Sequence, residues 1–85
     1  MRSGRVNLTT VMQKYYSYDE KRGLVAIRNL HATETIFFNG GNSHKRDAFP
    51  ILAGDVLTLE RGHIADEIWL ASDTVAHDSV VILVT

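Results

Sequence analysis

Histidine has the widest chemical range of any residue type in this 85-residue chain, because imidazole binds metals and transfers protons near neutral pH. The four histidines are His31, His44, His63 and His77. No two of them have the His-x-His or His-x-x-x-His spacing that places two side chains on one metal ion. Each falls in a segment predicted to be a turn or loop, so we expect exposed histidines. A zinc ion on a symmetry axis, with one histidine from each subunit, is the one metal hypothesis left, and no sequence feature points to it.

Acidic residues near predicted turns raise the question of a calcium site. They are Asp66, Glu67, Asp73 and Asp78. Calcium-binding loops need several oxygen ligands at alternating positions, and the segment from Asp73 to Asp78 lacks this spacing. We therefore expect solvated turn residues, with no metal and no other cofactor.

The residues of a catalytic triad occur close together but in an unsuitable pattern. Ser43, His44 and Asp47 are near neighbours in sequence, which rarely permits triad geometry, and no Gly-x-Ser-x-Gly elbow is present. Gly40 and Gly41 do not open a helix after a strand, which argues against a phosphate-binding loop. The sequence thus predicts a protein that is not an enzyme.

The remaining candidates are residues that contact other molecules without reacting. Basic residues and tyrosines gather near the N-terminus, a combination that nucleic-acid-binding proteins use for charge and stacking. The chain is slightly acidic overall and lacks the known nucleic-acid-binding motifs, so a protein interface is favoured. Trp69 faces out of its sheet if its neighbours are core, where it either anchors a protein contact or covers a neighbouring strand. The predicted interface residues are Arg2, Arg5, Tyr15, Tyr16, Tyr18 and Trp69.

Composition limits the chain to one small domain with one thin core. Cysteine is absent, so neither a disulfide nor a thiolate metal site stabilises that core. Oligomerisation is the remaining common way to bury more surface. No apolar run approaches the ~18 residues that span a membrane, and the N-terminus lacks the apolar segment of a signal peptide.

Charge is distributed unevenly along the chain, although the net charge is only −1. Residues 1–46 carry a net charge of +5 and residues 47–85 carry −6. Two interpretations are open. Either the halves interleave in the fold and the charges mix, or opposite faces carry opposite sign and dock on neighbouring copies or another protein.

Short segments of alternating polarity, separated by turn residues, predict an all-β fold. We expect residues 1–5 to form a flexible arm and residues 6–85 a single domain. The expected strands cover residues 6–18, 24–30, 35–38, 56–60, 67–71 and 79–85, with a doubtful seventh near residues 43–51. These elements predict a small antiparallel β-sandwich of six to seven strands, either a jelly roll or immunoglobulin-like.

Three local features refine this sandwich. Asn39-Gly40 predicts a tight hairpin turn, and Ala53-Gly54-Asp55 predicts a turn into the next strand. The last strand is apolar on both faces, so it is central or covered by a partner. The expected core residues are Ile27, Phe38, Leu57, Leu59, Ile68, Leu70 and Leu83.

The order of motifs carries a family resemblance. Ile27-Arg28-Asn29 ends a strand, Ile36 to Gly41 forms a strand and Gly-rich hairpin, and Phe49 to Asp55 approaches the next strand. Leu-x-Leu, Ile-Trp-x-x-Ser and Val-rich strands follow. This order, over about three-quarters of the chain, resembles small β-sandwich proteins that decorate or cement the capsids of tailed bacteriophages. The basic N-terminal region departs from that pattern.

The resemblance implies a non-enzymatic virion protein on the capsid surface, made in the host cytoplasm. It implies a homotrimer seated between subunits of the major capsid protein, with no membrane contact. Other functions stay open: a tail, baseplate or head–tail connector component, or a host-glycan-binding module, for which Trp69 with Asn42 and Asp73 is the only hint. A cupin-like domain or β-barrel enzyme would need His-x-His metal spacing, which is absent.

Overall fold

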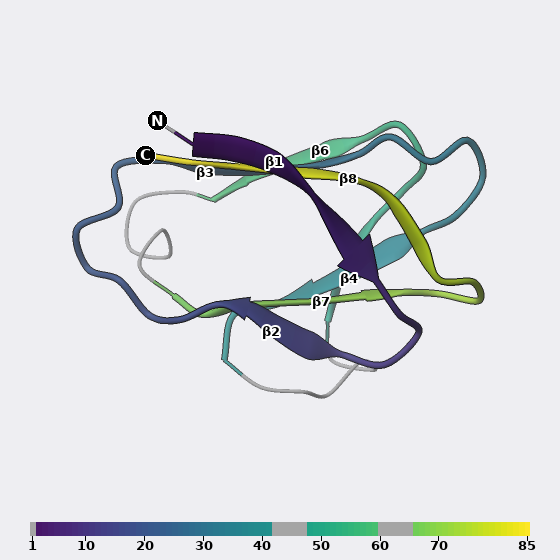
Figure 1. Cartoon of the computed structure of the whole chain (residues 1–85), viewed down its shortest axis with the longest axis horizontal. Coiled ribbons are helices and arrows are strands. Elements are labelled where there is room, and N and C mark those ends of the chain that lie inside the picture. The colour runs from purple at the N-terminus through teal and green to yellow at the C-terminus, as the bar shows by residue number, and fades with distance from the viewer. Residues whose placement is uncertain (1, 42–47, 60–65) are drawn as a thin grey trace.

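The computed structural model describes residues 2–41, 48–59 and 66–85, and these residues contain eight strands and no helix. The strands are β1 (Arg2–Leu8), β2 (Gln13–Tyr16), β3 (Val25–Asn29), β4 (Ile36–Asn39), β5 (Phe49–Ile51), β6 (Val56–Leu59), β7 (Ile68–Ser72) and β8 (His77–Val84). Sheet A has the order β1-β8-β3-β6 and sheet B the order β2-β7-β4-β5. Strands of the two sheets form separate layers in Figure 1, and both termini lie at one end. The predicted all-β sandwich is confirmed.

The strand order identifies this sandwich as a jelly roll. In an immunoglobulin-like sandwich the first two strands are neighbours in one sheet. Here β1 and β2 lie at edges of different sheets, and β8 returns to lie beside β1. Consecutive strands alternate between the sheets except for β4 and β5, which pair as a hairpin. Eight strands in two such sheets are the jelly-roll arrangement, and they exceed the six to seven that we predicted.

The expected flexible arm over residues 1–5 is wrong for residues 2–5. These residues belong to β1, which pairs with β8 over its length, from Arg2 opposite Val84 to Leu8 opposite His77. The reason is that β8 is apolar on both faces and belongs in the middle of a sheet. Its backbone needs a partner on each side, and β1 supplies one of them.

The single strand expected over residues 6–18 is divided into β1 and β2. The chain leaves sheet A after Leu8, which is buried in the core, and enters sheet B, where Lys14 pairs with Trp69. The Thr9 carbonyl accepts a hydrogen bond from the Ser72 N–H at 2.8 Å, which fixes the crossing point. Because polarity alternates through residues 6–18, the sequence pattern did not indicate that the chain changes sheet.

The core lies between the two sheets and consists of alternate residues from both. Its buried members are Leu8, Val25, Ile27, Ile36, Ile51, Leu59, Ile68, Leu70, Val80 and Ile82, with Phe38 and Leu57 packed against them. The predicted core is therefore confirmed except for Leu83. Ile82 is fully buried opposite Ile27, which places Leu83 on the outer face of sheet A. Because β8 is apolar on both faces, the alternation of side chains along the strand does not show which face is buried.

The predicted turn at Ala53-Gly54-Asp55 is confirmed. The Leu52 carbonyl accepts a hydrogen bond from the Asp55 N–H at 3.0 Å, and Gly54 has a φ of 82°. Because φ is positive at the third position of this four-residue turn and not at Ala53, the turn is type II, which favours glycine there.

The hairpin predicted at Asn39-Gly40 is present, but its connection is longer than a two-residue turn. Phe38 lies opposite Phe49, so the register excludes a tight turn at that dipeptide. Ile36 opposite Ile51 sets this register, because both side chains are buried in the core. The doubtful strand near residues 43–51 is confirmed at its end as β5, while residues 42–47 lie outside the described residues.

Candidate functional site

Four connections between the sheets lie at the end of the sandwich that is opposite the chain termini (Figure 1). They span residues 9–12, 30–35, 52–55 and 73–76. Each joins two strands that hold the same position in their sheets, so the connections lie side by side in the order β1–β2, β7–β8, β3–β4, β5–β6. Neighbouring strands are about 4.8 Å apart, which gives this row a length of about 14 Å. We call this surface the loop end.

Hydrogen bonds tie each connection of the loop end to the next. They include backbone bonds from the Ser72 N–H to the Thr9 carbonyl (2.8 Å), from the Asp73 N–H to the Thr35 carbonyl (3.1 Å), from the Gly54 N–H to the Asn29 carbonyl (3.0 Å) and from the Asn29 N–H to the Asp55 carbonyl (2.9 Å). These bonds cross between segments that are far apart in sequence. The loop end is therefore a connected surface rather than four independent loops.

Asn29 links two of these connections through its side chain. It is fully buried at the end of β3, and its Nδ2 donates to the carbonyls of Glu34 (2.7 Å) and Ile51 (3.0 Å). Its Oδ1 accepts from the His31 N–H at 3.0 Å. The amide thus satisfies backbone groups that would otherwise be buried without partners.

Glu34 binds the β7–β8 connection through its carboxylate. The side chain is 9% exposed and accepts hydrogen bonds from the Ser72 hydroxyl, from the N–H and hydroxyl of Thr74, and from the Val75 N–H (3.0 Å). These bonds, above all the one from the Thr74 N–H, lower the pKa of Glu34 to about 2, although burial opposes the shift. A carboxylate held in its charged form by four donors is a structural clamp, not a proton donor or acceptor near pH 7.

His31 and His77 contact each other beside this clamp, with ring centroids 4.4 Å apart. The Nδ1 of His31 accepts from the N–H of Thr33 (3.1 Å) and of Glu34 (3.0 Å), and the Nδ1 of His77 accepts from the Ser79 N–H (3.1 Å). Both neutral rings therefore carry their proton on Nε2. A metal bound at Nε2 would require the proton on Nδ1, where it would meet these N–H donors. This geometry disfavours metal binding by either ring.

The expectation of exposed turn histidines is wrong for both described rings. His31 and His77 are half-buried, and His77 begins strand β8. Burial, followed by the nearby His31, lowers the pKa of His77 below its ordinary value, while Glu34 and Asp78 oppose that shift. Its Nε2 is buried and has no hydrogen-bond partner among the described residues. The other two histidines lie outside the described residues.

A shallow concavity of about 430 Å³ opens at the β1 side of the loop end. Its lining consists of Asn7, Leu8, Thr9, Ala76, His77 and Asp78. These residues include one imidazole and one carboxylate among amide, hydroxyl and aliphatic groups, without a cluster of reactive groups. We therefore interpret the concavity as a depression in a contact surface rather than as a catalytic site.

Each connection of the loop end exposes one large aliphatic side chain. Val11 is 66% exposed, Val75 49%, Leu30 41% and Leu52 56%. A single exposed aliphatic residue is ordinary on a protein surface, but one on every connection of a 14 Å row, about three strand spacings, indicates an interaction site. The same connections contain three acids and no lysine or arginine: Glu34, Asp55 and Asp73.

The predicted interface residues near the N-terminus are dispersed rather than gathered in one patch. Arg5 is exposed on β1, and Arg2 begins the same strand. Tyr15 and Tyr16 pack against the core, and burial raises the pKa of Tyr15, whose hydroxyl donates to the Asn7 carbonyl. Tyr18 is 63% exposed in the β2–β3 connection, at the end opposite the loop end. Tyr15 and Tyr16 thus stabilise the fold through their packing against the core.

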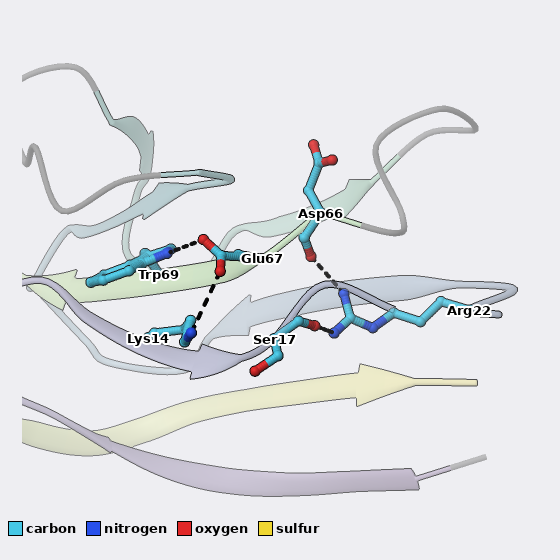
Figure 2. Close-up of polar contacts among 6 residues, drawn as sticks. All are labelled: Lys14, Ser17, Arg22, Asp66, Glu67 and Trp69. Atoms are coloured by element: carbon cyan, nitrogen blue, oxygen red, sulfur yellow. Dashed lines mark hydrogen bonds and ion pairs between the residues drawn. The ribbon is translucent and has the colours of Figure 1, made fainter. Parts of the chain in front are cut away.

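Trp69 lies on the outer face of sheet B, as the alternation with its buried neighbours predicts. Figure 2 shows its Nε1 donating to the Glu67 carboxylate at 3.0 Å and the Lys14 ammonium 3.5 Å from the same carboxylate. The indole bond is the main reason that the pKa of Glu67 is lowered. Trp69 is therefore half-buried and fixed in orientation.

Arg22 closes the end of the sandwich opposite the loop end. Only 8% of it is exposed, and its guanidinium donates to the carbonyls of Ser17 (2.5 Å) and Asp66 (2.6 Å), as Figure 2 shows. It also lies 5.6 Å from the centroid of the Tyr16 ring. This arginine joins the β2–β3 connection to the segment before β7.

Sequence reasoning missed the loop end as a site. Val11, Leu30, Leu52 and Val75 are separated by about 20 residues each, and every one stands alone beside a turn. The available signal was one apolar residue in every second connection between strands. That signal has meaning only when the order of strands in both sheets is known.

No protein-family model, curated protein sequence or solved structure matches this chain. Within the parts of the chain that the structure describes, no three histidine, aspartate or glutamate side chains lie close enough together to hold a metal ion.

Proposed function

We propose that this chain is a non-enzymatic structural protein of a tailed-bacteriophage virion. In this proposal it is a capsid decoration protein that forms homotrimers and binds between subunits of the major capsid protein. The observation that supports it is the loop end, where four hydrogen-bonded connections each expose one aliphatic side chain. An ordered apolar surface suits contact with another protein, because little conformational entropy remains to be lost on binding.

Two further arguments support the proposal. Jelly rolls recur in viral capsid proteins, although a shared fold is only an analogy for function. The order of motifs from Leu24 to Thr85 also resembles phage decoration proteins. For such a protein weak contacts suffice, because many copies bound to one lattice gain avidity.

Co-sedimentation with assembled shells tests the proposal. The shells are assembled from the major capsid protein of the phage that encodes this chain. We expect the wild-type protein to sediment with the shells at a saturable ratio and to raise the temperature at which they break. Absence of sedimentation at concentrations well above those of the shell subunits would refute the proposal.

The Leu52→Ser, Val75→Ser double variant assigns the binding to the loop end. Both side chains are about half exposed, so their replacement should leave the fold intact while removing apolar contact area. Tyr18→Ser is the matched control, because Tyr18 is 63% exposed at the opposite end. We expect the double variant to lose shell binding and the control to keep it. The reverse result would place the shell contact at the end of the sandwich that carries Tyr18.

Glycan binding is a second candidate, favoured by the outer face of sheet B. Trp69 offers an aromatic ring of fixed orientation beside a carboxylate and an ammonium group, Glu67 and Lys14. Such a ring can pack on the apolar side of a sugar while charged groups bind its hydroxyls. A glycan array probed with wild type and with Trp69→Ala tests this: binding lost in the variant supports it, and no wild-type binding refutes it.

A further inference from the structure

The outer face of sheet A is apolar and basic. Strand pairing places two rows of side chains across its four strands: Arg5, Val81, Arg28 and Val56 in one row, and Ser3, Leu83, Ala26 and Thr58 in the next. These positions alternate with the buried core residues of the same strands, so they lie on the face away from sheet B. Val56 is 58% exposed.

Among the described residues of β1, β3, β6 and β8 that lie on this face, Arg5 and Arg28 are the lysine or arginine residues, and both are exposed. Each lies directly beside Val81, on opposite sides of β8. The ion pair that the structure shows between described residues is elsewhere, between Lys14 and Glu67. Two arginines flanking apolar side chains are suited to a partner that carries carboxylates around an apolar centre.

The loop end of the same chain has the complementary character. Its four connections expose aliphatic side chains and contain no lysine or arginine. Asp55, in the β5–β6 connection, is an exposed carboxylate of this surface, and Asp78, the second residue of β8, is an exposed carboxylate just beyond the β7–β8 connection. One surface of the molecule thus combines apolar residues with acids, and another combines apolar residues with bases.

The spacing of the charges also agrees. Arg5 and Arg28 lie on β1 and β3, which are separated by β8, so their backbones are roughly 10 Å apart. Asp55 directly precedes β6 and Asp78 lies in β8. These strands are separated by β3, so the two acids are also two strands apart, roughly 10–12 Å. Two arginine–carboxylate pairs can therefore form at once across one contact.

We propose that the loop end of one copy docks on the outer face of sheet A of a second copy. This inference rests on the proposed function and names the partner of the loop end. The two surfaces differ, so the contact is heterologous, and its repetition closes into a ring or continues as a chain. A contact between two sheet A faces is disfavoured, because it would bring arginine pairs together. In the ring, sheet B faces the shell, so the Leu52→Ser, Val75→Ser variant would lose shell binding because it loses the contact between copies.

Sedimentation velocity over a series of concentrations tests the contact with charge-reversed variants. The first variant is Arg5→Glu, Arg28→Glu and the second is Asp55→Arg, Asp78→Arg. We expect wild type to form an oligomer that weakens between about 0.05 M and about 0.5 M salt. Each variant should associate at least about tenfold more weakly, because like charges then face each other. All four positions are exposed, so unfolding temperatures should stay close to that of wild type.

The variant with all four reversals provides the decisive result. It restores opposite charges across the proposed contact with the signs exchanged, so its mass should return to that of wild type. Restoration supports the docking of these two surfaces specifically. A wild-type monomer at every concentration, or a four-fold variant that stays monomeric although it is folded, would overturn the inference.

The outcome is separate from the test of function. If wild type forms the charge-dependent oligomer but does not sediment with shells, the contact between copies is supported and the virion function is refuted. If wild type is monomeric but binds shells through the loop end, the function stands and this contact is wrong. Oligomers that are insensitive to both charge reversals would also exclude it.

Discussion

Replacing Asn29 by alanine should separate the connections of the loop end and destabilise the whole domain. The side chain is fully buried and makes three hydrogen bonds, to the carbonyls of Glu34 and Ile51 and from the N–H of His31. Alanine makes none of them. The perturbation therefore removes one side chain and leaves three backbone groups without their protein partner.

The expected loss follows from these three groups. A buried polar group that loses its partner costs roughly 1–3 kcal/mol. Water can reach His31, which is half-buried, so we take the lower value for each group and expect a loss of about 3 kcal/mol. A domain of 85 residues has a free energy of unfolding of about 4–13 kcal/mol. The loss corresponds to a fall in Tm of roughly 12–24 °C.

Urea and thermal unfolding, followed by circular dichroism and by the fluorescence of Trp69, measure this loss. Asn7→Ala is the matched control, because Asn7 is exposed on β1 and its backbone carbonyl still accepts the Tyr15 hydroxyl. We expect the control to change the free energy of unfolding by less than about 0.5 kcal/mol. Asn29→Ala and Asn7→Ala with equal effects would refute the view that the amide locks the loop end.

Asn29→Asp sharpens the same test. It keeps the shape but points carboxylate oxygens at the carbonyls of Glu34 and Ile51, where the amide donated protons. The folded state then favours the protonated acid, so the folded-state pKa of this aspartate lies above its unfolded value. The stability of this variant relative to wild type is therefore greatest at low pH and is lost as pH rises through the folded-state pKa. A variant whose stability relative to wild type instead rises steadily with pH would contradict the proposed hydrogen bonds.

Three further predictions test the clamp, the type II turn and the core. The pKa of Glu34 is about 2 against an ordinary 4.5, so stability is fully present above pH 4.5 and falls toward pH 2; acid titration of Glu34→Gln should show a shallower fall. Gly54→Ala should cost about 1–2 kcal/mol because of its φ of 82°, whereas Gly41→Ala, equally free of steric contact, should be near neutral in urea unfolding. Ile82→Ala should cost about 2–5 kcal/mol and Leu83→Ala less than about 1 kcal/mol by the same assay.

Local patterns predicted the strands well where one face of a strand is polar. Val25 and Ile27 alternate with Ala26 and Arg28, and the structure buries the first two and places the others outside. The turn at Gly54 was equally clear, because few residues other than glycine adopt its φ. In these segments the local chemistry and the tertiary fold require the same arrangement.

The prediction failed where local chemistry allowed two arrangements. Leu83 was placed in the core because β8 is apolar on both faces, and only pairing with β1 and β3 decides which face is buried. Val11 was read as part of one long strand because polarity alternates through the crossing between sheets. The loop end could not be predicted for the same reason, since it depends on strand order rather than on any local sequence.

The polar groups at the loop end explain how so small a domain can present a defined contact surface. Asn29 and Glu34 together accept or donate bonds to three of the four connections, and the backbone bond from Ser72 to Thr9 joins the remaining one. Apolar packing alone would tolerate several loop arrangements, whereas hydrogen bonds between buried groups are directional and favour one. Exposed Leu52 and Val75 are then held in place before any partner arrives. A partner consequently loses little of its binding free energy to ordering loops, which is the condition under which a row of only four aliphatic side chains can support association.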